Sequence, residues 1–399
     1  MWTTRDRLAA GAGLLLFAVT MAAPGAAQRK PRARDLGVPF DGAPGPLNAI
    51  TDVAGVTVGH TTLVDGDGPL VVGRGPVRTG VTVILPRGSA SLQEPVFAGW
   101  FSLNGNGEMT GTTWVGESGF LEGPVAITNT HSVGVVRDAL VAWRARSAPD
   151  PSGYWWSLPV VAETWDGYLN DINGFHVKDR HVFDALETAR AGAVAEGNVG
   201  GGTGMVCYGF KGGIGTASRR LGPAAGAYTV GVLVQANFGR RPQLRVAGVP
   251  VGQEVPDETP QALVRDAARR GDLGSIIVVV ATDAPLLPHQ LDRVARRVPL
   301  GLARTGSTSG NGSGDIFIAF STANRGAFRA RGLADLTMAS NEEISPLFDA
   351  TVEATEEAIV NALVAADTMT GIDGRRVTAL PHDRLQAVLK AYNRLGPTR

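Results

Sequence analysis

The sequence predicts a layered α+β fold. Its strand-like and helical segments are mixed without the regular β-α-β alternation of a doubly wound sheet, and it holds no tandem repeat. Hydrophobic residues make up 44% of the 399 residues and charged residues 19%, an ordinary balance for a globular protein with a sizeable core. The 53 glycines fall in short clusters, so many tight turns and close backbone approaches are expected.

The chain opens like a targeting signal. Arg5 and Arg7 precede the apolar stretch "LAAGAGLLLFAVTMAA", and small residues follow it. We expect residues 1–27 to be a signal peptide that is removed after Ala27. The apolar stretch is short for a membrane span and ends before Pro24, which favours removal over a retained anchor. The mature protein is therefore expected to be exported, periplasmic or secreted, with no attachment to the membrane.

Composition also limits the partners and the redox chemistry. Residues 28–46, rich in Pro, Arg and Gly, are expected to form a flexible lead-in to a single domain over residues 47–399. The 37 basic and 37 acidic side chains balance, which argues against a nucleic-acid-binding protein. Cys207 is the one cysteine, so an internal disulfide is excluded. Because its neighbours are apolar, we expect a buried structural thiol.

The first half of the domain starts with three predicted strands. Segment 49–63 alternates valines with glycine turns, segment 80–88 is β-branched and ends in a proline and a glycine, and segment 123–134 is the third predicted strand. A helix is predicted over 135–147, where apolar residues recur three and four apart, and another over 182–192, which a glycine ends.

The second half contains the longest apolar runs. Three strands are predicted, and one of them, after Ser275, is β-branched throughout; amphipathic spacing predicts three helices. The strands are 227–239, the run from Ser275 and 315–323; the helices are 259–271, 288–305 and 344–366. The glycine-dense segment 196–220 has fragments like a phosphate-binding loop, but it lacks the Gly-Lys-Ser/Thr of such a loop, so nucleotide binding is not expected.

Metal and triad chemistry have weak signals. The histidines form no His-Glu-x-x-His motif, and His176 and His181, five apart, are expected to face solvent or cap a helix, so no metal and no cofactor are expected. The segment "GESGF" around Ser118 resembles a nucleophile elbow, but Phe120 replaces its last glycine, which argues against that site. The histidines are His60, His131, His176, His181, His289 and His382.

The stretch "RRGDLGSIIVVVATDAP" places Ser275 at the mouth of an apolar strand. A hydroxyl there needs a hydrogen-bond partner or a function, and a neighbouring backbone group is the commoner explanation. The other explanation is nucleophilic. If the Gly274–Ser275 bond is cut, the new α-amine titrates near neutral pH and can act as base for the hydroxyl of the same residue. A glycine before the serine crowds the attacked carbonyl least.

Several long motifs in a fixed order favour the second explanation. Over nearly all of residues 45–382 they resemble those of the DmpA/BapA-type self-processing aminopeptidases, N-terminal-serine hydrolases also described as L-aminopeptidase D-amidase/D-esterases and β-peptidyl aminopeptidases. The motifs are "NAITDVAGVTVGH", "NTHSVG", "VVAETWDGYLND", "GGTGMVCYGFKGGIGTASR", "VLVQANFG", "GSIIVVVATDAPLLPHQL" and "TGSTSGNGSGDIFIAFSTAN".

The resemblance implies roles for residues on both sides of Ser275. The Gly274–Ser275 bond would be the self-cleavage site and Ser275 the nucleophile. Ser313 and Asp315, in "GNGSGDIF", match the hydroxyl and carboxylate that orient the nucleophile and relay protons. That carboxylate is often a glutamate, one methylene longer. Without the resemblance, Ser and Asp between glycines would indicate a turn.

The resemblance also implies an oxyanion site and an amine anchor. Asn237 in "QANFG" matches the amide that stabilises the tetrahedral oxyanion, with the backbone N–H of Gly314 as a second donor. Trp165 stands where a tyrosine is expected, and its larger indole can donate a hydrogen bond but pass no proton. Glu163 matches the carboxylate that holds the free amino group of the substrate. Taken alone, Asn237 would indicate a turn or cap and Glu163 a solvated side chain.

The implied protein is an exported serine aminopeptidase. It would act through an acyl-enzyme on short peptides, amides or esters with a free amino terminus. Its implied fold is a four-layer αββα sandwich of the DmpA/ornithine-acetyltransferase type, a single catalytic domain over 47–399 cut into chains 28–274 and 275–399. Such αβ heterodimers are expected to assemble into homo-oligomers.

Two other functions stay open from the sequence. An acyltransferase of the related ornithine-acetyltransferase architecture would cleave itself in the same way but usually uses threonine, so Ser275 argues against it. A non-catalytic periplasmic binding protein would need no serine at the start of the strand. The sequence does not choose among L-, D- and β-aminoacyl substrates.

Overall fold

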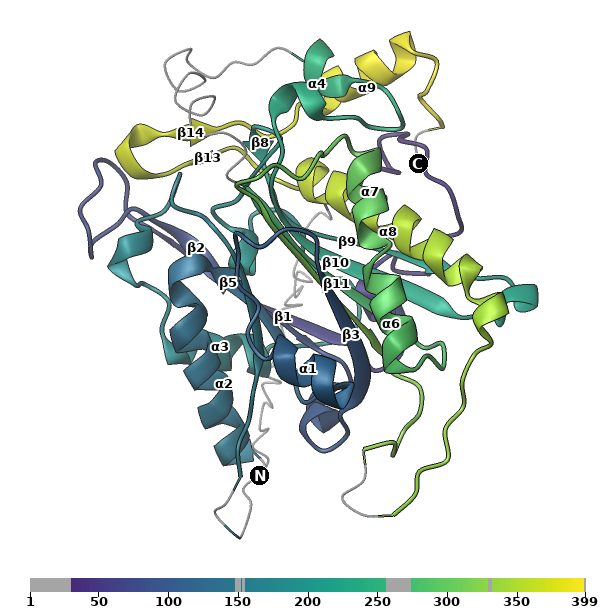
Figure 1. Ribbon diagram of the computed structural model, residues 1–399. Helices are drawn as coiled ribbons and strands as arrows, with labels where there is room; N and C mark the ends of the chain where they lie inside the picture. Colours follow the sequence, from purple (N-terminus) through teal and green to yellow (C-terminus); the bar gives the residue numbers. More distant parts are fainter. Residues whose placement is uncertain (1–29, 148–151, 153–154, 256–273, 329–331, 398–399) are drawn as a thin grey trace, which may run out of the picture. The chain divides into compact units, whose positions relative to one another are not determined.

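The β-branched segments of the chain form two sheets that lie face to face between two layers of helices (Figure 1). The computed structural model describes residues 30–147, 152, 155–255, 274–328 and 332–397. One compact unit spans Pro31–Arg399. The layer order, helices, sheet, sheet, helices, confirms the predicted αββα sandwich.

The first sheet has four strands in the order β1-β2-β5-β6. Its β5 and β6 are parallel and are joined through helix α2, whereas the other pairs are antiparallel. Helices α2 and α3 cover its outer face (Figure 1). The bounds are β1 (Thr57–Asp65), β2 (Val77–Leu85), β5 (Val125–Asn129), α2 (Val133–Ser147), β6 (Val160–Thr164) and α3 (Asp179–Glu187).

The second sheet has six strands in the order β4-β3-β12-β11-β10-β9. Only the central pair β11 and β12 is parallel, and helices α6 and α7 connect it. Helix α8 packs across β9 and β10, and α6 packs across β3 and β12 (Figure 1). The bounds are β3 (Val96–Ser102), β4 (Phe120–Leu121), β9 (Gly213–Arg220), β10 (Thr229–Asn237), β11 (Ser275–Thr282), α6 (Pro288–Ala295), α7 (Val298–Arg304), β12 (Gly314–Ser321) and α8 (Ser345–Val364).

Smaller elements complete the described chain. Helix α1 precedes β4, helices α4 and α9 lie near each other beside the sandwich, and two short hairpins extend from it. Within the described residues, the structure has no helix that is both long and apolar enough to cross a membrane. The bounds are α1 (Thr112–Ser118), β7 (Val206–Cys207), β8 (Phe210–Lys211), α4 (Val251–Glu254), β13 (Met369–Thr370), β14 (Arg376–Val377) and α9 (His382–Ala391).

Strand β11 explains why the run after Ser275 is apolar throughout. Side chains of a strand point alternately to its two faces. Ile276 and Val278 face the core beneath the helices, whereas Ile277 and Val279 face the core between the sheets. Because both faces are covered, neither position tolerates polar residues. The same alternation turns Ser275 toward the four-stranded sheet.

The segment 31–46 differs from the flexible lead-in that its composition predicts. Ala33 is fully buried in the core beneath the helices, and its N–H donates to Asn361 Oδ1 over 3.0 Å. Arg32 pairs with Glu196 at 2.8 Å, and Arg34 pairs with the fully buried Glu357 at 2.8 Å. The prediction was wrong because the partners of these arginines are distant in sequence. Leaving such a buried charge unpaired costs about 3–5 kcal/mol.

Other sequence expectations differ in detail. The helix predicted over 288–305 is two helices, α6 and α7, because Pro299 has no N–H to donate to a preceding turn. Helix α3 ends at Glu187, before the predicted Gly192. The predicted signal peptide 1–27 and the predicted helix 259–271 lie outside the described residues.

Candidate active site

Three neighbouring strand ends meet around Ser275. In the register of the six-stranded sheet, Ser275 lies opposite Asn237 of β10 on one side and opposite Gly314 of β12 on the other. Alternation along β10 and β12 turns both neighbours toward the four-stranded sheet, as it does for Ser275. Residues nearly forty positions apart on either side are therefore brought together by strand register alone.

The hydroxyl of Ser275 is buried and has a partner. Gly314 N–H donates to Ser275 Oγ over 3.2 Å, and Ser275 is 4% exposed. A backbone N–H at the nucleophile is the kind of donor that also stabilises an oxyanion. The sequence posed a backbone partner and a catalytic function as alternatives for this hydroxyl, and the structure shows the backbone partner.

Gly274 is glycine for a steric reason that the sequence could not show. A Cβ at this position would lie 2.3 Å from Asn237 O and 2.4 Å from Phe238 Cα, both on or beside β10. Main-chain atoms within a sheet cannot move away from such a contact. The residue before Ser275 can therefore enter the sheet only without a side chain.

Ser313 and Asp315 form a hydrogen-bonded pair directly before and within β12. Ser313 Oγ donates to Asp315 Oδ1 over 2.6 Å, and both residues are buried. The aspartate, although shorter than a glutamate, thus reaches the hydroxyl. Asn104 holds Asp315 from the β3–α1 loop, since its Oδ1 accepts the N–H of Asp315 over 2.6 Å.

Asn237 is fixed at both ends of its amide. Its Oδ1 accepts the N–H of Val206 over 2.7 Å, and its Nδ2 donates to the carbonyl oxygen of Trp165 over 2.9 Å. An amide nitrogen carries two N–H donors, so a second one is left for an oxyanion beside Ser275. Trp165 contacts Asn237 through its main chain, whereas its indole lies against Gly167.

Glu163 is a buried carboxylate and not the solvated side chain that its type alone suggests. It lies near the end of β6 with 3% exposure, Oε1 accepts the N–H of Glu108 over 3.0 Å, and Oε2 accepts the hydroxyl of Thr130. Burial raises the pKa of Glu163, and the nearby charge of Glu108 raises it further, against the opposing hydrogen bond from Thr130. A cation bound beside Glu163 would relieve this cost.

The β3–α1 loop contacts both the residue before β12 and the Glu163 carboxylate. Asn106 N–H donates to Ser313 O over 3.3 Å, and two residues later Glu108 N–H donates to Glu163. The loop therefore spans from the six-stranded sheet to the four-stranded sheet. In a bound substrate, an acyl group at Ser275 would lie on one side of this loop, and an ammonium group at Glu163 would lie on the other.

Comparisons with known proteins place the chain in a family. The family model of peptidase family S58 matches residues 48–377. The chain belongs to peptidase family S58. It is 55% identical over 397 residues to the β-peptidyl aminopeptidase BapA of Sphingosinicella microcystinivorans, covering 97% of this chain and 98% of that one. It is 50% identical over 397 residues to the enzyme of the same name from Sphingosinicella xenopeptidilytica, covering 98% of each.

Solved structures place this S58 peptidase among the Ntn-hydrolase folds. The L-aminopeptidase D-Ala-esterase/amidase of Ochrobactrum anthropi, described as a prototype of the serine aminopeptidases, superposes with a TM-score of 0.84 at 50% identity, covering 92% of this chain and 100% of that one. A β-aminopeptidase of Burkholderia sp. gives 0.81 at 51% identity, covering 90% and 98%. The chain is thus a serine-type aminopeptidase.

Three residues of the candidate site escaped the sequence analysis. Asn104 orients Asp315, Thr130 orients Glu163, and Asp166 holds the loop that follows Trp165. Asp166 is fully buried, Asn129 and Asn170 donate to its carboxylate, and burial raises its pKa to about 6. Each lies in or beside a polar motif at a strand end, the one signal that could have drawn attention to it.

The other candidates have structural roles. Ser118 Oγ, at the end of α1, donates to Trp114 O over 2.8 Å. His176 contacts Asp171 at 2.9 Å, and His181 Nδ1 accepts the N–H of Lys178 at the start of α3, as expected for a cap. In the part of the chain that the structure describes, no three His, Cys, Asp or Glu side chains gather as metal ligands.

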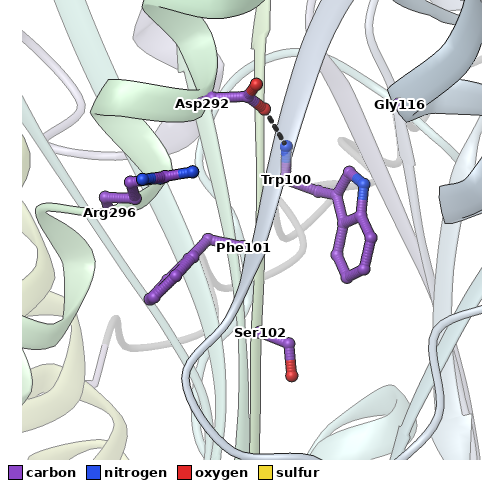
Figure 2. Close-up of a pocket in the computed structure, with 6 residues that line it drawn as sticks. All are labelled: Trp100, Phe101, Ser102, Gly116, Asp292 and Arg296. Atoms are coloured by element: carbon purple, nitrogen blue, oxygen red, sulfur yellow. Dashed lines mark hydrogen bonds between the residues drawn. The ribbon is translucent and has the colours of Figure 1, made fainter.

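A cavity of about 360 Å³ lies apart from these residues. It opens between β3, α1 and α6, where the carboxylate of Asp292 accepts the N–H of Trp100 over 3.0 Å (Figure 2). Ser102 lies at the end nearest the β3–α1 loop. None of the candidate catalytic residues lines it. Its lining residues are Trp100, Phe101, Ser102, Gly116, Asp292 and Arg296.

Proposed function

We propose that the protein is an exported aminopeptidase that cuts its own Gly274–Ser275 bond and then releases N-terminal residues through an acyl-enzyme on Ser275. The single observation that carries this proposal is the meeting of Ser275 Oγ, Gly314 N–H and Asn237 at adjacent strand ends. Export is supported by the pattern of residues 1–27. The names of the two BapA relatives support β-aminoacyl peptides or amides as substrates.

Self-cleavage needs groups that the uncleaved chain already holds. Ser275 Oγ attacks the carbonyl carbon of Gly274, forming an ester as the C–N bond breaks, and the Ser275 nitrogen takes the proton that the hydroxyl loses. The Ser313–Asp315 pair beside Gly314 is the group available to relay that proton. Water then hydrolyses the ester, leaving a carboxylate on Gly274 and a free amine and hydroxyl on Ser275.

Turnover repeats the same attack with a better base. The freed α-amine of Ser275, with a pKa near neutrality, accepts the proton of its own hydroxyl as Oγ attacks the acyl carbon of the substrate. Asn237 Nδ2–H and Gly314 N–H stabilise the tetrahedral oxyanion. When the tetrahedral intermediate collapses, the C–N bond breaks and the leaving amine takes the proton. Water then hydrolyses the acyl-enzyme ester through the same steps in reverse.

Glu163 supplies selectivity for a free amino terminus. The buried Glu163 carboxylate accepts two hydrogen bonds, which hold it in one orientation. A substrate ammonium beside this carboxylate would replace the stabilisation by water that burial removes. An N-blocked substrate has no such charge. We therefore assign Glu163 as the amine anchor.

The purified protein is expected to give two fragments on a denaturing gel. Since the attack takes place at Gly274, the smaller fragment should begin Ser-Ile-Ile-Val in N-terminal sequencing. A single intact chain, or a fragment with another first residue, would argue against Ser275 as the processed nucleophile.

Glu163→Gln is expected to separate maturation from turnover. The scissile bond of the chain itself presents no free amine, so cleavage should go to completion, while kcat/KM for amino-terminal amides falls. Gln retains an oxygen for the N–H of Glu108 and an amide that can donate to Thr130 Oγ1, so folding should be preserved.

The pH profile gives an independent readout of this anchor. Because the pKa of Glu163 is raised, its carboxylate is lost on acidification at a higher pH than for an ordinary glutamate, and kcat/KM should fall with it. Protonation of the Ser275 α-amine, the proposed base, gives an acidic limb of its own, so Glu163→Gln should keep that limb and lose only the further fall that Glu163 causes. Glu122→Gln, which alters a glutamate bonded to Trp114 Nε1 instead, should keep both. Normal turnover of fully cleaved Glu163→Gln protein would contradict the anchor role.

A further inference from the structure

Asp166 is a buried carboxylate that no step of the proposed reaction uses. It is fully buried on the turn that follows β6. Asn129 Nδ2 donates to its Oδ2 over 3.1 Å, and Asn170 Nδ2 donates to its Oδ1 over 3.0 Å. Thr79 adds a side-chain hydrogen bond, so the three side chains that hold this charge are all neutral. Burying a charge is costly, and a carboxylate with both oxygens paired makes the polar groups around it rigid.

The turn that Asp166 closes holds the amide of Asn237. The carbonyl oxygen of Asp166 accepts the N–H groups of Leu169 and Asn170, each over 3.1 Å. The Asp166 nitrogen and the Trp165 carbonyl belong to one planar peptide group. That carbonyl accepts Asn237 Nδ2 over 2.9 Å, so the direction of the second Nδ2–H depends on where the turn lies.

The same carboxylate is bonded to the strand end that supports the amine anchor. Asn129 is the last residue of β5, and the next residue is Thr130, whose hydroxyl donates to Glu163 Oε2. In the parallel register of β5 and β6, Asn129 lies opposite Thr164, the residue after Glu163. The hydrogen bond from Asn129 to Asp166 therefore fixes the end of β5 beside the anchor.

We infer that Asp166 is a positioning residue that keeps Asn237 and Glu163 in one relative geometry. It acts on the first through the Trp165 carbonyl and on the second through the end of β5 that carries Thr130. This inference rests on the proposed function. A short chain of carbons joins the acyl carbon and the ammonium of the substrate, so the groups that bind the oxyanion and the ammonium must keep a matching separation.

Asp166→Asn keeps the shape of the side chain but removes one acceptor. Both oxygens of Asp166 accept N–H groups, whereas an amide has one oxygen, so either Asn129 or Asn170 loses its partner. We expect kcat/KM for a β-alanyl chromogenic amide to fall roughly tenfold to a hundredfold, the scale of a small misplacement of catalytic groups. Self-cleavage should slow as well, because it uses Asn237.

Double-mutant cycles separate positioning from a general loss of stability. In protein that carries Asn237→Ala the oxyanion amide is gone, so Asp166→Asn should have a clearly smaller further effect on kcat than in the unmodified enzyme. In protein that carries Glu163→Gln it should likewise have a smaller further effect on KM. A loss caused by weaker folding would multiply with either substitution. Fully independent effects in either background would overturn the inference.

Asp171→Asn is the matched control on the same segment. Asp171 is also buried, and its Oδ2 accepts the N–H of Gly73 over 2.8 Å and contacts His176 Nε2 at 2.9 Å. These side-chain contacts reach neither functional group, so the variant should keep the kcat, the KM and the self-cleavage rate of the unmodified protein. If it lost as much as Asp166→Asn, the loss would come from folding and the inference would fail.

Asn129→Ala gives a second test should Asp166→Asn not fold. It removes the donor to Asp166 Oδ2 and leaves the bond from Asn170, so KM for the amide should rise while self-cleavage keeps its rate. An unchanged KM in folded, cleaved Asn129→Ala protein would overturn the inference and leave the proposed function intact. If the unmodified protein neither cleaved itself nor hydrolysed the amide, the proposed function would fail instead.

Discussion

The Ser275→Ala protein is expected to remain a single uncleaved chain and to lose aminopeptidase activity by roughly 10⁶-fold, the scale seen when a serine nucleophile is removed. One hydroxyl attacks first the Gly274 carbonyl and later the substrate, so both reactions should disappear together. The fold should persist, because alanine fits the buried start of β11 and only the Gly314 N–H loses a partner. A denaturing gel and release of a chromogenic amine measure the two reactions.

Ser118→Ala is the control for that experiment. Ser118 was the other serine in a nucleophile-like motif, and its hydroxyl bonds to Trp114 O at the end of α1. Its alanine variant should cleave and turn over normally. Fragments from Ser275→Ala protein, or an uncleaved Ser118→Ala chain of native thermal stability, would move the nucleophile away from Ser275.

Asn237→Ala is expected to lower kcat by about 10²–10³, the usual effect of removing one oxyanion donor. The loss should fall on kcat more than on KM, since the donor acts on charge that develops in the transition state. Self-cleavage should slow as well, because both reactions pass through an oxyanion at the same place. Time courses of fragment formation and steady-state kinetics of the matured protein measure the two effects.

Asn198→Ala controls for the structural part of that loss. Like Asn237, Asn198 accepts one backbone N–H and donates to one backbone carbonyl, both of Asp367, but it lies at an exposed turn. If both variants lowered kcat equally, or if Asn237→Ala changed KM alone, the oxyanion role would be wrong and the amide would serve only to join Val206 to Trp165.

Much of the fold follows from local pattern. The β-branched run after Ser275 predicted a buried strand, and β11 is buried on both faces over its whole length. Apolar spacing predicted helices at α2 and α8 within a few residues of their ends. These predictions succeed because the spacing of apolar residues shows which face of a helix or strand packs on the core. That spacing lies entirely within the element's own residues.

Tertiary partners explain where local pattern fails. Residues 31–46 have the composition of a linker, yet Arg32 and Arg34 enter ion pairs with Glu196 and Glu357. Glu163 has the type of a solvated residue, yet β6 carries it into the interior beside Thr130. No window of sequence contains both members of these pairs, so composition could not reveal them.

The sequence by itself determined the chemistry of this protein: a glycine–serine junction at the start of an apolar strand, with candidate partners in separate motifs. Only the tertiary structure decided how these groups meet. Strand register brings Asn237 and Gly314 to either side of Ser275, and the β3–α1 loop orients Asp315 and donates an N–H to Glu163. The physical reason is that residue types fix which protons and charges a chain can offer. Distances of a few ångströms between residues far apart in the chain arise only when sheets and loops pack.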